Sequence, residues 1–153
     1  MYEYYMEVKM LAWTHEESIP TRATGAQVWA LWSRPHEWNR WDEGLEWVTL
    51  EGTFVSGTWG RLKPVGGPEV KFVILEAWPE RGFTDRALLP LTRLDFIHLY
   101  TPGPLPEQGG RVTVRIEMRG VLTPLFKRII GRDIQKTLSA TLDRFAAQAE
   151  KVE

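Results

Sequence analysis

The sequence predicts a single-domain α+β fold in which one long C-terminal helix covers a curved, seven-stranded antiparallel sheet. Six strand-like segments follow one another between residues 45 and 122, separated by turns rich in Gly and Pro. After Pro124, apolar residues recur every three or four positions for about 25 residues, as on one face of a helix. The length of 153 residues fits one domain, taken as residues 1–153.

The N-terminal quarter predicts one strand and two short helices. A strand is expected over residues 8–19, the first strand-like segment of the chain. Thr24 is a suitable N-cap for a helix through Val28 and Trp32. Pro35 suits the first turn of a second helix that ends near Trp41.

The middle of the chain predicts the rest of the sheet. Its expected strands cover residues 45–51, 58–63, 70–78, 82–89, 91–100 and 111–122. In the last of them, apolar residues from Val112 to Met118 alternate with polar residues from Arg111 to Arg119. Such a strand is half-buried, with one face in solvent.

The terminal helix is the only predicted element long and apolar enough to cover the other face of the sheet. Its apolar stripe runs from Leu125 to Ala149. Gly131 interrupts the run of good helix formers, and we expect a bend there.

Composition excludes several classes of function. The chain has no cysteine, which excludes disulfides, zinc–thiolate sites, iron–sulfur clusters and a cysteine nucleophile. Its 19 basic and 20 acidic residues give a net charge of −1, which argues against a nucleic-acid partner. Neither a signal sequence nor a membrane-spanning stretch is recognisable, so we expect a cytoplasmic protein without stable membrane insertion.

Several short motifs together resemble one superfamily. They are the Val28-Trp29 pair, Ser33-x-Pro35, Trp38-x-x-Trp41, Gly57-Thr58-x-Gly60, Glu76-x-x-Pro79, Phe96-x-His98 and Gly109-Gly110-x-Val112-Thr113. From about residue 13 to residue 150 the chain resembles the START-like, helix-grip superfamily, in particular its bacterial polyketide cyclase/dehydrase and lipid-transport branch. These motifs consist of turn glycines, packing aromatics and strand residues. They therefore indicate the fold and do not indicate a particular reaction.

The resemblance implies a deep cavity between the sheet and the terminal helix that holds lipids, polyketides or other hydrophobic molecules. It implies no shared cofactor, and some members are enzymes. The expected partner is therefore a small hydrophobic molecule, bound by a monomer or a homodimer.

Three polar residues are candidates for chemistry inside such a cavity. His98 shares its parity with Phe96 on a strand whose charged residues have the other parity, so it is expected to face inward. His15 and Glu17 share their parity with Trp13, and they face inward if the first strand is regular. The alternatives are a core histidine with a protein partner, and a strand that twists both residues toward solvent. We expect no metal site, because no ligand spacing is present.

The expected ligand-binding surface combines apolar residues of the strands, the terminal helix and the second short helix. Trp38 and Trp41 are expected at the cavity mouth, whereas most of the eight tryptophans pack the short helices onto the sheet. Of the neighbours Asp85 and Arg86 one faces inward, and Arg86 is expected outside. The expected lining consists of Phe72, Ile74, Leu94, Phe96, His98, Tyr100, Val114, Ile116, Met118, Ile130, Ile134, Leu138, Trp38 and Trp41.

Three functions remain open from the sequence. The first is a carrier or sensor that binds a small hydrophobic ligand and orients it with His98, Tyr100, His15 and Glu17. The second is an enzyme of the polyketide cyclase or dehydratase kind, in which His98 and Glu17 transfer protons. The third is an interaction protein whose cavity is closed by tryptophans.

Overall fold

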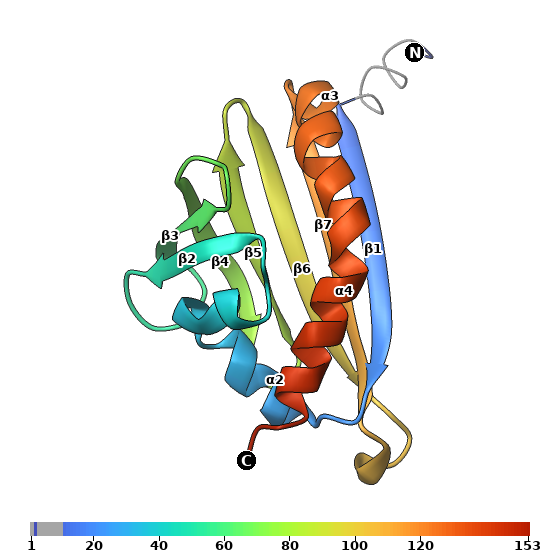
Figure 1. Ribbon diagram of the computed structural model, residues 1–153. Coiled ribbons are helices and arrows are strands. Elements are labelled where there is room, and N and C mark those ends of the chain that lie inside the picture. Colours follow the sequence, from blue (N-terminus) through green and yellow to red (C-terminus); the bar gives the residue numbers. More distant parts are fainter. Residues whose placement is uncertain (1, 3–10) are drawn as a thin grey trace.

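A computed structural model describes residue 2 and residues 11–153 and shows one seven-stranded antiparallel sheet crossed by a long helix (Figure 1). The strand order β1-β7-β6-β5-β4-β3-β2 makes β1 and β2 the two edges. The strands are β1 (Ala12–Thr21), β2 (Leu45–Leu50), β3 (Trp59–Pro64), β4 (Val70–Trp78), β5 (Gly82–Leu89), β6 (Thr92–Pro102) and β7 (Gly110–Gly120). The helices are α2 (Gly25–Trp32), the 3₁₀ helices η1 (Pro35–Arg40) and η2 (Pro106–Gln108), α3 (Thr123–Phe126), the π-helical η3 (Lys127–Gly131) and α4 (Arg132–Ala149).

This arrangement confirms the predicted helix-grip fold, and the differences lie at the ends of elements. The first strand is seen from Ala12 to Thr21, two residues beyond the predicted end, and its predicted residues 8–10 lie outside the described part. The predicted strand 91–100 begins one residue later, because Leu91 has a φ of 50° in the turn before it. The last strand was predicted to end at residue 122. It ends at Gly120, because the backbone φ of this glycine is 138°.

The helix after β1 begins as the sequence predicts. The Thr24 hydroxyl accepts a hydrogen bond from the Gln27 backbone N–H, and the Gln27 side chain accepts one from the Thr24 N–H. This capping box fixes the start of α2. The second short helix is a 3₁₀ helix that ends at Arg40, so Trp41 lies just beyond it.

Aromatic rings fill the end of the molecule that holds α2 and η1. Trp32 stacks on Phe145 of α4 with ring centroids 5.6 Å apart, and Trp38 donates its indole N–H to the Trp32 carbonyl. Trp41 meets Phe145 edge-on at 4.9 Å. We call this group the aromatic cluster: Trp32, Trp38, Trp41, Phe54, Phe72, Phe83 and Phe145.

The C-terminal helix is uneven along its length. It runs in front of β7 and beside β1 (Figure 1), and its second half buries residues including Leu142 and Phe145. In its first half Ile130, Ile134 and Leu138 are only half-buried. At Gly131, where the sequence predicts a bend, the structure has a π-helical turn, a frequent mark of functional sites. No helix in the described part of the chain is long and apolar enough to cross a membrane.

Candidate functional site

Four polar side chains share the inner face of the sheet with its apolar core. Strand register places them in two neighbouring rows that run across the sheet from β1 to β5. The first row reads Glu17, Val114, His98 and Phe83, and the second reads His15, Ile116, Phe96 and Asp85. The inward direction predicted for His98 is therefore seen, and His15 and Glu17 also face inward, because β1 is regular here.

His98 and Asp85 form a buried acid–imidazole pair. His98 Nδ1 lies 3.8 Å from Asp85 Oδ1, and the imidazole stacks on the Phe83 ring at 4.0 Å. Burial lowers the pKa of His98 to about 4 and raises the pKa of Asp85 to about 8. Near neutral pH the pair is therefore a carboxylic acid beside a neutral imidazole, without an ion pair between them.

His15 and Glu17 form a second pair at the edge of the sheet. His15 Nε2 lies 3.5 Å from Glu17 Oε1, and the imidazole stacks near the Trp13 indole with centroids 6.1 Å apart. Their side chains keep 21 % and 27 % of their surface exposed, which leaves this pair in contact with solvent. Glu16, between them in sequence, is exposed on the other face.

These pairs contain most of the buried polar atoms that lack a hydrogen-bond partner. Among the described residues such atoms are His15 Nε2, Glu17 Oε2, Asp85 Oδ1, His98 Nδ1 and Thr123 Oγ1. All but the threonine oxygen belong to the inner face. An unpartnered buried polar group costs about 1–3 kcal/mol, so these four atoms favour the binding of a molecule that can hydrogen-bond to them.

The apolar residues predicted to line a cavity fall into two groups. The first group is fully packed in the core: Phe72, Ile74, Leu94, Val114, Ile116 and Met118. The second is half-buried on the inner face or the helix: Phe96, Tyr100, Ile130, Ile134 and Leu138. The second group leaves surface for contact with a ligand.

The two tryptophans predicted at the mouth of a cavity are buried. Trp38 and Trp41 are buried in the aromatic cluster, because the short helix turns their rings toward Phe83 and Phe145. The Tyr100 hydroxyl donates a hydrogen bond of 2.8 Å to the Ala23 carbonyl, which ties β6 to the segment before α2. Its hydroxyl is therefore already engaged by the protein.

The structure does not bring His98 and Glu17 together. Val114 of β7 stands between them, which puts their strands about 10 Å apart. Each has a nearer partner, Asp85 and His15 respectively. The inward direction of Asp85 agrees with the prediction that its neighbour Arg86 faces outward, but the sequence did not predict Asp85 as the partner of His98.

Two strand arginines, Arg86 and Arg61, face outward. Arg86 binds Asp95 through two hydrogen bonds of 2.7 and 2.9 Å, and Arg61 is half-exposed. In residues 11–153 no group of three His, Asp or Glu side chains is arranged to hold a metal ion.

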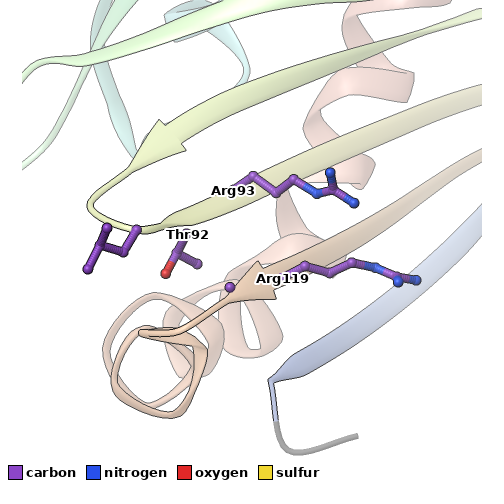
Figure 2. Close-up of a pocket in the computed structure, with 5 residues that line it drawn as sticks. Thr92, Arg93 and Arg119 are labelled. Carbon is purple, nitrogen blue, oxygen red and sulfur yellow. The ribbon is translucent and has the colours of Figure 1, made fainter. Parts of the chain in front are cut away.

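Two hollows, each of about 370 Å³, lie on the outer face of the sheet. One is lined by Glu51, Trp59, Gly60, Arg61, Lys71 and Leu88. The other, at the turn between β5 and β6, is lined by Leu91, Thr92, Arg93, Arg119 and Gly120 (Figure 2). Neither coincides with the four polar side chains of the inner face.

Solved structures share this fold at low sequence identity. The di-domain ARO/CYC StfQ from the steffimycin biosynthetic pathway matches with a TM-score of 0.75 and 15 % identity, over 97 % of this chain and 54 % of that one. The chain thus spans about half of StfQ. Ara h 8.0201 matches with a TM-score of 0.69 and 12 % identity, over 92 % of this chain and 99 % of that one. Norcoclaurine synthase from Thalictrum flavum matches with a TM-score of 0.68 and 15 % identity, over 92 % of this chain and 88 % of that one.

The sequence itself identifies the family. No curated protein matches the chain closely enough to count as a relative. The sequence model of one family, described as polyketide cyclase / dehydrase and lipid transport, matches residues 12–150. That range runs from the first residue of β1 to the residue after α4, so it contains the whole fold, including both polar pairs. With this match, the chain belongs to the polyketide cyclase / dehydrase and lipid transport family.

Proposed function

We propose that the protein binds a small hydrophobic molecule, such as a lipid or a polyketide, between the inner face of the sheet and α4, as a carrier or sensor. The observation that carries this proposal is the set of four buried, unpartnered polar atoms on the inner face, in His15, Glu17, Asp85 and His98. Hydroxyl or carbonyl groups of a ligand would supply the missing partners.

The surroundings of these atoms favour an apolar ligand body. Phe96 lies between the two pairs on the inner face, and Ile134 and Leu138 are half-buried on the side of α4 that packs against the core. Covering such surface contributes roughly 25 cal/mol per Å². Apolar burial would therefore supply most of the affinity, and the two polar pairs would fix the orientation.

Native mass spectrometry of the purified protein tests this proposal directly. We expect a non-covalently bound molecule that denaturation releases for identification. Its affinity is then measured for Glu17→Gln and His98→Gln, with Glu16→Gln and His36→Gln as controls, because those residues are exposed away from the inner face. Each site variant should weaken binding by roughly 5- to 100-fold, the range of one lost hydrogen bond in a buried site.

The absence of any bound molecule would count against the proposal. If, in addition, 8-anilinonaphthalene-1-sulfonate changes no tryptophan emission, the interior is closed by its own side chains. The protein would then act through its surface alone, a function that the packed aromatic cluster would favour.

The neutral Asp85–His98 pair favours a second candidate, an enzyme of the cyclase or dehydratase kind. Asp85, with a pKa of about 8, would give its proton to a ligand oxygen, and the neutral imidazole would accept a proton from carbon. Glu17 would then act separately, with His15. If His98→Ala abolishes conversion of the identified molecule and leaves its affinity intact, this second candidate is correct.

A further inference from the structure

Exposed apolar side chains gather at the end of the molecule opposite the aromatic cluster. Leu91, Val121, Leu125 and Ile129 are 75 %, 62 %, 51 % and 61 % exposed. The Val121 N–H donates a hydrogen bond to the Leu91 carbonyl, so the β5–β6 turn touches the segment after β7. Leu125 and Ile129 follow four residues apart on α3 and η3. We call these four residues the end surface. Single exposed apolar residues are ordinary, whereas a contiguous group indicates an interaction site.

The same end concentrates positive charge. Residues 119–132 contain four cations, Arg119, Lys127, Arg128 and Arg132, and no carboxylate; the next residue, Asp133, is the first. Since the whole chain has a net charge of −1, this distribution is markedly asymmetric. Lys127, Arg128 and Arg132 are exposed beside the apolar residues of α3 and η3.

Arg93 adds a fifth cation at this end, beside Arg119. Arg93 of β6 lies directly opposite Arg119 of β7, and Figure 2 shows their side chains extending in the same direction, away from the β5–β6 turn and back along the strands. Like charges in directly opposed strand positions repel each other. Within residues 11–153 neither forms an ion pair, whereas Arg86 and Arg115 on the same face bind Asp95 and Glu117. An anion between Arg93 and Arg119 would relieve the repulsion.

We propose that the end surface docks on membranes that contain anionic phospholipids. The four apolar side chains would enter the boundary between headgroups and acyl chains, while Arg93, Arg119 and the helical cations would contact lipid phosphates. This combination favours a membrane over a free phosphate, which two arginines alone would satisfy. It also disfavours a second copy of the chain, because two such surfaces would bring ten like charges together.

Vesicle co-flotation tests the proposal without any ligand in the interior, so the result is independent of the proposed function. We expect binding to vesicles of phosphatidylcholine mixed with phosphatidylserine, weaker binding to phosphatidylcholine alone, and release at high salt. The double variant Arg93→Gln/Arg119→Gln should lower the affinity roughly 30-fold, since each basic residue near an anionic surface contributes about fivefold. Leu125→Ser/Ile129→Ser should lower it by about tenfold or more.

The chain offers matched controls for both variants. Arg61 and Lys71 form another opposed cationic pair on the outer face, away from the end surface, and Arg61→Gln/Lys71→Gln should bind normally. Leu99 is 41 % exposed on that face, and its change to serine should have no effect. Circular dichroism of each variant checks that it is folded.

Four outcomes would overturn the proposal. They are equal binding to neutral vesicles, no binding to anionic vesicles, and equal losses in the control variants. The fourth is that something other than a membrane binds the end surface. Either inorganic phosphate binds Arg93 and Arg119 as tightly as anionic vesicles do, or the protein forms a dimer that Leu125→Ser/Ile129→Ser dissociates.

Discussion

Near neutral pH the Asp85 carboxyl keeps its proton and His98 stays neutral, because both side chains are desolvated inside the sheet. Two groups that would attract each other as ions in water are thus both uncharged 3.8 Å apart. Placing them in the core reduces stability relative to apolar residues, a cost that proteins tolerate at functional sites. At this scale the pair also makes the stability of the fold depend on pH.

The sign of that dependence follows from the two pKa values. The pKa of Asp85 rises from 3.8 to about 8 on folding, so its contribution to stability is complete below pH 3.8 and is lost as the pH rises through 8. The pKa of His98 falls from 6.5 to about 4, so its contribution is present above pH 6.5 and is lost as the pH falls. Between pH 4 and 6.5 the two oppose each other, and from 6.5 to 8 Asp85 acts alone.

We therefore expect the free energy of unfolding to fall between pH 6.5 and 8, by up to about 1.4 kcal/mol per pH unit from Asp85. Asp85→Asn should lack this decline, because the amide does not titrate. Urea unfolding at pH 6.5 and at pH 8 measures the free energy of unfolding of the wild-type protein and of Asp85→Asn. Asp143→Asn is the control, because Asp143 is exposed on α4. An equal decline in Asp85→Asn would show that Asp85 is ionised in the folded protein.

Residue directions could be predicted from the sequence only where a strand is regular. The alternation around His98 indicated its inward position correctly, because Arg93 and Asp95 mark the outer face of β6. The partner of His98 could not be predicted, since the pairing of Asp85 with Phe96 depends on the register between β5 and β6. For the same reason the expected joint action of His98 and Glu17 disagrees with the geometry.

At the scale of elements, local signals predicted the strands and helices well. The predicted strands 70–78 and 82–89 agree with β4 and β5 residue for residue. The capping residues of α2 and the proline of η1 also gave their starts. The π-helical turn could not be predicted, because it lies at a tertiary contact that local sequence does not show. Gly131 packs on the indole of Trp13, and a Cβ added to Gly131 would lie 3.2 Å from Trp13 Cζ2.

Gly60 of β3 tests how closely the elements are packed. A Cβ at this position would meet the Thr49 carbonyl of β2 and come within 2.6 Å of Phe72 Cζ on β4. Gly60→Ala should therefore destabilise the fold by roughly 1–3 kcal/mol, as overpacking does. Gly67→Ala is the control, because its nearest neighbour, Pro64, would be 3.4 Å away. Thermal denaturation of both variants measures the difference, and equal midpoints would mean that β3 shifts freely.

At the scale of the whole molecule, the two ends differ in packing. One end is closed by the aromatic cluster and the buried second half of α4. The other holds the end surface and the half-buried first half of the helix, where Ile130, Ile134 and Leu138 cover the core incompletely. A ligand entering the interior without unfolding the protein would meet less resistance at the second end, where fewer buried contacts must break.

Amide hydrogen exchange should reveal this division. Residues 127–138 combine a π-helical turn with exposed side chains, so we expect their amides to exchange through local opening, at rates that change little with low urea concentrations. Residues 141–149 pack on Trp32 and Trp41 through Phe145, so their amides should exchange only by global unfolding, with strong urea dependence. Equal urea dependence in both segments would contradict this, because the helix would then open as one unit and entry between helix and sheet would require unfolding.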